Sequence, residues 1–269
     1  MRKSSILTGK VVTGLVAVFF LASSTTVANA DHSWGNYHWA RTSNPFTLQL
    51  GDNLTTNWKT YLGEASADWL KSTVLDTNVI LGVKKGNCGA VSGRVEVCNA
   101  KYGSNGWLGI ASIWASGDHI VQGTVKLNDT YFNTAKYKFP SWRKLVMCQE
   151  VGHTFGLGHL DENFENKNLG TCMDYTNAPD GGGIYGPSNL TPNAHDYEQL
   201  EKIYTHTDST TTIKPTTAST GKAVVENLND PSSWGRPTGH EDARGRSSHF
   251  ELDLGNGQKL FTFVVWADN

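Results

Sequence analysis

The sequence has 269 residues, enough for one substantial domain with a proper core and a smaller accessory segment. Its formal net charge is −2, which argues against nucleic acid as a partner, because nucleic-acid binding needs a basic face. Beyond the N-terminus, no stretch is long and apolar enough for a membrane span, so we expect no membrane insertion.

The first 30 residues have the pattern of a secretory signal peptide. A basic start is followed by the apolar run Val11–Ala22 and by the small-residue sequence Ala28-Asn29-Ala30, typical of a cleavage site. We therefore expect a secreted, extracellular mature chain that begins near Asp31. Without residues 1–30 the chain keeps 20 basic against 25 acidic residues, a formal charge of −5.

The four cysteines of this exported chain indicate two disulfides. Sequence alone allows three pairings of four cysteines. Of the possible bridges we favour Cys88–Cys98, which would close a short Gly-rich loop.

The N-terminal part of the mature chain predicts a strand near Thr47–Leu50 and then a helix with Thr55 or Thr56 as N-cap. The apolar residues of this helix recur at helical spacing and form one buried stripe. They are Trp58, Tyr61, Leu62, Ala65 and Trp69.

Three further strands are expected before the next helix. The β-branched run Val79–Val83 predicts the first, and a Gly-rich loop with Cys88 and Cys98 follows it. Trp107–Trp114 and His119–Leu127 are expected to pair as a hairpin around a turn at 116–118, and 129–140 is expected to be a loop.

The next helix is expected to begin at Ser141 as N-cap and to end at Gly156 and Gly158, which turn the chain. One face of this helix carries an apolar stripe that runs into polar positions. That face consists of Trp142, Leu145, Val146, Gln149 and His153.

The C-terminal third predicts a helix, a linker and a small tail. Thr191-Pro192 is expected to open a last helix that runs to about Tyr204, with proline at its first position. Residues 205–220 are threonine-rich and are expected to be a linker. In the tail, 221–269, two apolar strands flank Gly255-Asn256-Gly257, a strong hairpin signal.

The candidate catalytic and metal-binding side chains are concentrated in the segment Cys148–Asp161, which reads C-Q-E-V-G-H-T-F-G-L-G-H-L-D. A catalytic zinc site has three protein ligands and one open position. Side chains at i and i+4 of a helix can reach one ion, and a glutamate beside the first can accept the proton of an attacking water. Gln149, Glu150 and His153 have this spacing.

The segment resembles the metzincin zinc peptidases, whose motif is H-E-x-x-H-x-x-G-x-x-H followed by a methionine turn. The plan of residues 45–204, within a metallopeptidase-like domain expected over 31–204, is similar to that of secreted bacterial matrixin-like enzymes. The resemblance implies an α/β metallopeptidase-like domain with a twisted mixed sheet, an active-site helix, a Met-turn and a C-terminal helix, and a small β-rich extension follows. It also implies Zn²⁺ as cofactor, with a structural Ca²⁺ as a further candidate ion. The substrate would be a protein or peptide, and the protein would be a monomer.

The same resemblance implies a role for each matching residue. His153 and His159 would bind zinc, and Glu150 would be the general base. Gly156 and Met173 would shape the site, and Tyr175 would stabilise the oxyanion. The hairpin strand before the helix would line the cleft and pair with an extended substrate.

The resemblance also bears on the cysteines. Cys148 and Cys172 immediately precede the motif and the methionine turn, so a Cys148–Cys172 bridge would brace the site. Cys88 lies in G-N-C-G and not in the motif by which matrixins cap their zinc. Latency by that route is therefore not predicted.

Gln149 stands where the family has its first histidine, and three interpretations remain open. In the first, Gln149 acts as a weak third ligand through its neutral amide oxygen, a donor better suited to Ca²⁺ or Mg²⁺ than to zinc. Alternatively, Asp161, His119 or His195 completes the shell. In the third interpretation the protein is an inactive relative that binds a peptide or another partner.

Overall fold

The computed structural model describes residues 1, 31–83, 87–213, 227–239, 241–242 and 244–267. Apart from Met1, the predicted signal peptide lies outside the described residues, and so do residues 214–226, where the predicted linker ends and the tail begins. No helix in the described ranges is both long and apolar enough to cross a membrane.

One nine-stranded mixed sheet organises the fold, with strand order β3-β2-β4-β6-β5-β9-β8-β7 and β1 paired with β6. The pairs β2–β3, β2–β4, β4–β6 and β1–β6 are parallel. The pairs β5–β6, β5–β9, β8–β9 and β7–β8 are antiparallel. The strands are β1 (His38–Trp39), β2 (Phe46–Asn53), β3 (Leu75–Leu81), β4 (Val95–Ala100), β5 (Trp107–Ser116), β6 (His119–Asn128), β7 (Arg236–Pro237), β8 (His249–Gly255) and β9 (Gln258–Trp266). The predicted α/β class with a mixed sheet is confirmed.

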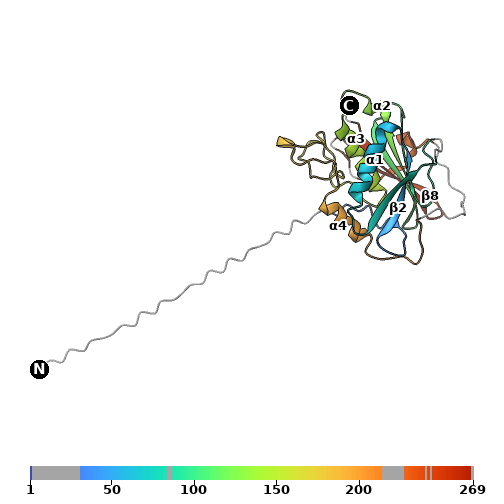
Figure 1. The fold of residues 1–269 in the computed structure, drawn as a ribbon, viewed down its shortest axis with the longest axis horizontal. Coiled ribbons are helices and arrows are strands. Elements are labelled where there is room, and N and C mark those ends of the chain that lie inside the picture. The colour runs from blue at the N-terminus through green and yellow to red at the C-terminus, as the bar shows by residue number, and fades with distance from the viewer. Residues whose placement is uncertain (2–30, 84–86, 214–226, 240, 243, 268–269) are drawn as a thin grey trace.

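Helices α1 and α3 lie against each other beside the sheet (Figure 1). The α-helices are α1 (Thr56–Trp69), α2 (Asp129–Phe132), α3 (Pro140–His153) and α4 (Ala194–Ile203), and short 3₁₀ turns occupy Gly183–Tyr185 and Pro231–Ser233. Two glycines permit the close packing of α3. A Cβ at Gly109 of β5 would lie 2.5 Å from Val146, and one at Gly152 would lie 2.7 Å from both Met173 and Trp69.

The observed helix starts can be compared with the predicted N-cap residues. Thr55 is the N-cap residue of α1, as one of the two predicted alternatives. The prediction of Ser141 as a cap is wrong, because α3 begins at Pro140, whose fixed φ suits the first turn. The predicted start of the last helix is also wrong, because Asn193 caps α4 in a capping box with Asp196.

Two strand predictions need correction. The strand predicted at Val79–Val83 is β3, which begins earlier, at Leu75, because its buried residues are at its start. Strand β4 was expected to be part of the Gly-rich loop, yet it pairs with both β2 and β6 in the middle of the sheet. The strands of the two predicted hairpins are confirmed as β5 with β6 and β8 with β9.

The tail joins the sheet through β9, which is buried on both faces. Phe261, Phe263 and Val265 enter the core beneath α1 and α3. Leu260, Val264 and Trp266 enter a second core on the opposite face, with Trp107 and Trp234. This double burial explains why β9 reads as an almost continuous apolar run. It also gives a short tail without cysteines the core that it lacks by itself.

The described part of the predicted linker also contacts the domain. Asp208 and Thr212 donate backbone hydrogen bonds to the carbonyl oxygens of Arg41 and Ala40, at 2.8 and 3.0 Å. The remaining linker positions, 214–220, lie outside the described residues.

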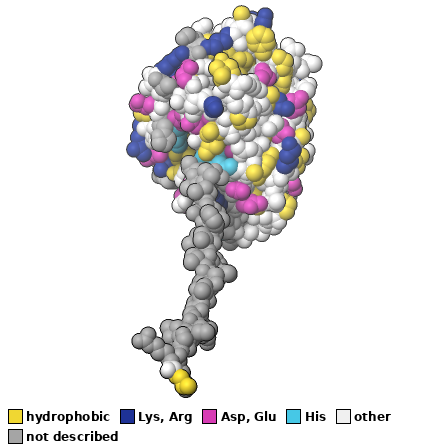
Figure 2. Space-filling view, turned by 90° about the vertical axis from the view of Figure 1, so that its left-hand side faces the viewer, with side chains coloured by type: hydrophobic (Ala, Val, Ile, Leu, Met, Phe, Trp, Pro, Cys, Tyr) yellow, Lys and Arg dark blue, Asp and Glu magenta, His cyan; other side chains and the backbone are white. Residues whose placement is uncertain are grey.

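On the face seen in Figure 2, acidic and basic side chains are interspersed.

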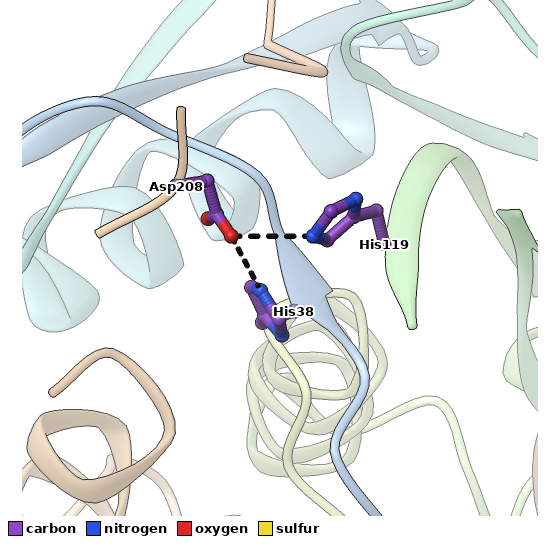
Figure 3. A group of neighbouring side chains, drawn as sticks. All are labelled: His38, His119 and Asp208. Carbon is purple, nitrogen blue, oxygen red and sulfur yellow. Dashed lines mark hydrogen bonds and ion pairs between the residues drawn. The ribbon is translucent and has the colours of Figure 1, made fainter. Parts of the chain in front are cut away.

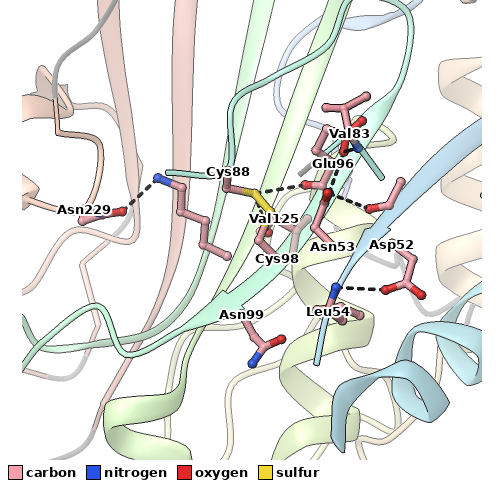
Figure 4. Close-up of a disulfide and its surroundings, with 12 residues drawn as sticks. Asp52, Asn53, Leu54, Val83, Cys88, Glu96, Cys98, Asn99, Val125 and Asn229 are labelled. Carbon is pink, nitrogen blue, oxygen red and sulfur yellow. Dashed lines mark hydrogen bonds between the residues drawn. A yellow bond between two sulfur atoms is a disulfide. The ribbon is translucent and has the colours of Figure 1, made fainter. Parts of the chain in front are cut away.

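Both favoured disulfides are present. Cys88 bonds to Cys98 on β4 (Figure 4), with a Cα separation of 5.9 Å. Beside this bridge Asn53 donates a hydrogen bond to the buried Glu96 carboxylate at 2.6 Å. Cys148 of α3 bonds to Cys172, with a Cα separation of 6.0 Å. The second bridge fixes the helix of the motif to the segment before Met173.

The buried side chain of Lys126 makes the free energy of unfolding depend on pH. Lys126 donates to Asn229 at 2.8 Å, and burial lowers its pKa to about 8. Because the folded protein binds this proton more weakly than the unfolded chain, the contribution of Lys126 to stability rises from pH 8 to about 10.5. We expect the unfolding free energy of wild type, relative to that of Lys126→Met, to increase by up to about 3 kcal/mol as the pH rises across this range. Denaturant unfolding at several pH values measures this change, and Lys101→Met on the exposed surface is the matched control.

Candidate active site

Helix α3 brings the first part of the motif into the interior. From Leu145 to His153 every residue of the helix is buried, between α1 on one side and the sheet on the other. Glu150 faces β5, because a Cβ at Gly109 would lie 2.7 Å from its carboxylate oxygen. Gly152 faces the other way, toward Met173. Met173 therefore packs against the face of α3 that points away from Glu150.

Gly156 turns the chain after α3 and returns His159 to the helix. Its φ of 103° is a conformation that residues with a side chain rarely adopt, and a Cβ there would lie 2.9 Å from the Tyr37 carbonyl oxygen. As a result the rings of His153 and His159 stand 4.5 Å apart and perpendicular to each other. The two histidines that the motif predicts as ligands are thus neighbours.

Each of these histidines is oriented by a hydrogen bond at Nδ1. His153 donates to the Leu157 carbonyl oxygen at 2.7 Å, and His159 donates to the Glu162 carboxylate at 2.9 Å. Their Nε2 atoms are buried and have no hydrogen-bond partner within the described residues. Burial also lowers the pKa of His153 well below its usual value, so its imidazole is neutral. Imidazole rings held by a hydrogen bond at Nδ1, with Nε2 unpaired, are typical of metal-binding histidines.

Gln149 lies on α3 one turn before His153 and is almost fully buried. Neither its amide oxygen nor its amide nitrogen has a hydrogen-bond partner within the described residues. An unpaired buried amide is costly, because it loses its hydrogen bonds to water. The position therefore carries a polar group whose partner is not among the described side chains.

Glu150 is also completely buried, and burial raises the pKa of its carboxyl group well above the usual value. The backbone N–H groups of Ala111 and Val265 act in the opposite direction. Neither makes a hydrogen bond of normal geometry with the carboxylate. The Glu150 carboxyl group therefore holds a proton more tightly than an exposed glutamate does.

Strand β9 covers the site. Phe263 stacks on the ring of His153 at 4.3 Å, and His249 stacks on Phe263 at 4.2 Å. The hydroxyl group of Tyr175 donates to the carbonyl oxygen of Val264. Tyr175 also lies beside His159, with ring centroids 4.6 Å apart. In this conformation the chain's own strand contacts the residues expected to act on a substrate.

The strand that lines the site differs from the expected one. The hairpin strand directly before the helix is β6, which lies inside the sheet between β4 and β5. Strand β5 is the one beside Glu150, and its outer edge pairs with β9 from Trp107 to Ser116. The reason is that β6 already has a hydrogen-bonded neighbour on both sides, so it offers no edge to a peptide.

The structure shows other contacts for the three alternative ligands. His119 forms an ion pair with Asp208 at 3.2 Å. The Asp161 carboxylate accepts a hydrogen bond from the Asn163 backbone, and the His195 ring lies 5.0 Å from that of His32. None of the interactions described for them joins them to His153.

Sequence reasoning missed two histidines near the motif. His32 faces the Gly158 carbonyl oxygen through Nδ1 at 3.2 Å, and His249 stacks on Phe263. Burial lowers the pKa of each to about 4. No local signal identifies them, since each comes from a segment far from the motif in sequence.

Comparisons with known proteins add little. No family model matches the sequence, and no curated protein matches it. A solved structure of myroilysin is similar with a TM-score of 0.36 and 11% sequence identity, and the match covers 62% of this chain and 96% of that chain. A likeness of this strength carries no argument about activity, so the function is argued from the residues of the site.

Proposed function

We propose that this chain is a secreted zinc-dependent endopeptidase with Glu150, His153 and His159 in its active site. The observation that carries the proposal is the pair of buried, unpaired Nε2 atoms on two neighbouring imidazoles. Their Nδ1 atoms are fixed by Leu157 and Glu162, the outer contacts that metal-bound histidines require. The two disulfides are consistent with export to an oxidising environment.

The donor set fits zinc with one unusual member. His153 and His159 supply two nitrogen ligands, and Gln149 supplies the oxygen of its unpaired buried amide as the third. A zinc ion held there would polarise a substrate carbonyl group and make water a nucleophile at neutral pH. An amide oxygen is a weaker zinc ligand than imidazole, so we expect a lower affinity than that of a three-histidine site.

The chain's own residues would then handle the proton and the charge. Glu150 would accept the proton of the attacking water and deliver it to the leaving amine. The hydroxyl group of Tyr175 would donate to the oxyanion that forms on the substrate carbonyl. In the closed conformation this hydroxyl donates to a peptide carbonyl of β9 instead, which is the same chemical group that a substrate presents.

Strand β9 would act as an internal substitute for the substrate. A peptide that binds by strand addition pairs with the free edge of a sheet. The edge of β5 beside the catalytic glutamate is taken by β9 along its whole length. We therefore assign the described conformation to a latent form, from which β9 must move before a substrate can bind.

A second candidate function is a non-catalytic binding protein with the same fold. The observation that favours it is the combination of Gln149 at a ligand position with β9 over the site. In that case β9 would be a permanent part of the sheet, and the buried polar cluster would have no metal.

A variant that weakens the packing of the C-terminal tail on the domain distinguishes the two proposed functions. Trp234 anchors the tail in the second core, away from the histidines, with its Nε1 donating to Leu228 at 2.8 Å. We expect Trp234→Ala to raise hydrolysis of a quenched-fluorescent disordered protein about tenfold over wild type, because a large-to-small core change weakens docking by a few kcal/mol. A zinc chelator should stop the reaction, and added zinc should restore it.

The same assay with Gln149→His decides the role of the glutamine. If Trp234→Ala folds normally by circular dichroism yet neither it nor wild type cleaves the substrate at any zinc concentration, the peptidase proposal is wrong. If cleavage then appears only with Gln149→His added, the natural protein is the binding protein. We expect Gln149→His to raise zinc affinity of an already active enzyme by about tenfold or more.

A further inference from the structure

A second cluster of metal-type side chains lies apart from the motif (Figure 3). His38 is in β1 and His119 opens β6, opposite it in the parallel register. Asp208 follows α4 and points between these two histidines. His206, from the same segment, stacks edge-on against His38 with ring centroids 4.6 Å apart. Segments about 170 residues apart in sequence therefore bring four possible ligands together.

The ligand atoms converge at short and similar distances. Asp208 Oδ1 lies 3.2 Å from His119 Nε2, 3.5 Å from His38 Nε2 and 3.6 Å from His206 Nε2. The Nε2 atoms of His38 and His206 are 3.2 Å apart. Ligand atoms around a tetrahedral zinc with bonds near 2.0–2.1 Å are separated by roughly 3.3 Å. These four of the six separations lie within a few tenths of an ångström of that value. The ligand atoms of His38, His119 and Asp208 all lie within 4.8 Å of one another, and His206 stands beside this group of three.

The groups are oriented for this role by their outer contacts. His38 donates from Nδ1 to the Asn36 carbonyl oxygen at 2.6 Å, which leaves the lone pair of a neutral ring at Nε2. Asp208 Oδ2 accepts from the backbone and the guanidinium of Arg41, at 3.1 and 3.0 Å, so Oδ1 faces the histidines. Outer contacts of this kind hold metal ligands in place.

Hydrogen bonds among these groups leave one close contact unsatisfied. With its N–H at Nδ1 donated to Asn36, His38 presents only a lone pair at Nε2, which lies 3.5 Å from the Asp208 Oδ1 acceptor. One divalent cation bound at Nε2 of the three rings and at Oδ1 satisfies all four atoms at once.

We propose that His38, His119, His206 and Asp208 bind a structural zinc ion. Three imidazoles and one carboxylate form a closed tetrahedral set, which is typical of structural and not catalytic zinc. The ion would tie β1, β6 and the segment after α4 into one unit. The site lies at the surface, where His119 is 38% and His206 56% exposed, so an ion can enter without unfolding. This site is independent of the peptidase proposal.

Cobalt spectroscopy on the full chain tests the proposal. Metal-free protein that carries His153→Ala and His159→Ala retains only the new site. We expect it to bind one equivalent of Co²⁺ with the intense visible bands of tetrahedral coordination, displaced by zinc. Adding His206→Ala, a change at a half-exposed ring, should weaken Co²⁺ binding about a hundredfold. The matched control is His195→Ala in the same background, which should bind as before.

A second measurement covers the case in which a variant misfolds. Zinc should raise the Tm of wild type and of His153→Ala/His159→Ala, and should not raise that of a protein with His119→Ala and His206→Ala added. Circular dichroism checks the fold of each. The proposal is overturned if the His153→Ala/His159→Ala protein binds no cobalt, binds it with weak octahedral bands, or keeps its affinity after His206→Ala.

Discussion

Glu150→Gln is expected to lower kcat for peptide hydrolysis by about a thousandfold, measured in the Trp234→Ala background, where turnover is fastest. Glutamine keeps the size of the side chain and its place against Gly109, yet it cannot accept the proton of the attacking water. Zinc binding should persist, since Glu150 is not one of the proposed ligands. The matched control is Glu64→Gln on the exposed face of α1, with an ion pair to Lys144 at 3.3 Å.

The stability of the same variant distinguishes a catalytic role from a structural one. Burial raises the pKa of Glu150, so the folded protein holds this proton more tightly than the unfolded chain does. Its contribution to stability is therefore present at low pH and is lost as the pH rises above the usual range of a glutamate. We expect metal-free Glu150→Gln to be at least as stable as wild type at neutral pH. Equal losses of activity and stability would contradict a catalytic role.

Locking β9 onto β5 is expected to abolish hydrolysis of protein substrates. Ser112 and Thr262 lie directly opposite each other across the β5–β9 pair, and both are buried. Cysteines at such positions have the spacing for a disulfide. If substrate must replace β9, the oxidised Ser112→Cys/Thr262→Cys protein in the Trp234→Ala background should be at least about tenfold slower than either single variant, because strand addition needs that edge.

The locked protein also has an internal control. Cobalt or zinc bound by the histidines should be unaffected, since neither cysteine belongs to the proposed ligand set. Mass spectrometry confirms the third disulfide, and the single variants report any effect of the substitutions themselves. Full activity in the locked protein would show that peptides reach the site without the β5 edge, and the assignment of a latent form would be wrong.

The sequence predicts local features well because their signals are local. Helical spacing identifies the buried stripe of α1 and the shared face of Gln149 and His153. The turn Gly255-Asn256-Gly257 likewise marks the hairpin of β8 and β9. Both disulfides are confirmed, although the Cys148–Cys172 bridge was expected only through the resemblance to metzincins.

Contacts between distant segments could not be predicted in the same way. Nothing within the sequence of β9 specifies that it pairs with β5. A strand buried on both faces lacks the alternation of apolar and polar residues from which its place in a sheet could be predicted. The fold assembles the proposed metal site from three segments, with His38, His119 and Asp208 together and His206 beside them. Single histidines in such segments have no spacing pattern to reveal them. Strand β4 was missed because the glycines and cysteines around it favour a loop.

If the described conformation is the proposed latent form, the double burial of β9 implies that its activation runs in one direction. Residues 260–266, L-F-T-F-V-V-W, contain no charge, proline or glycine. Such a segment is prone to form intermolecular β-sheet once it leaves its fold. A tail that left the sheet but stayed attached to the chain would therefore drive self-association of the protein. Removal of the tail by cleavage avoids this outcome, and the cut cannot be reversed.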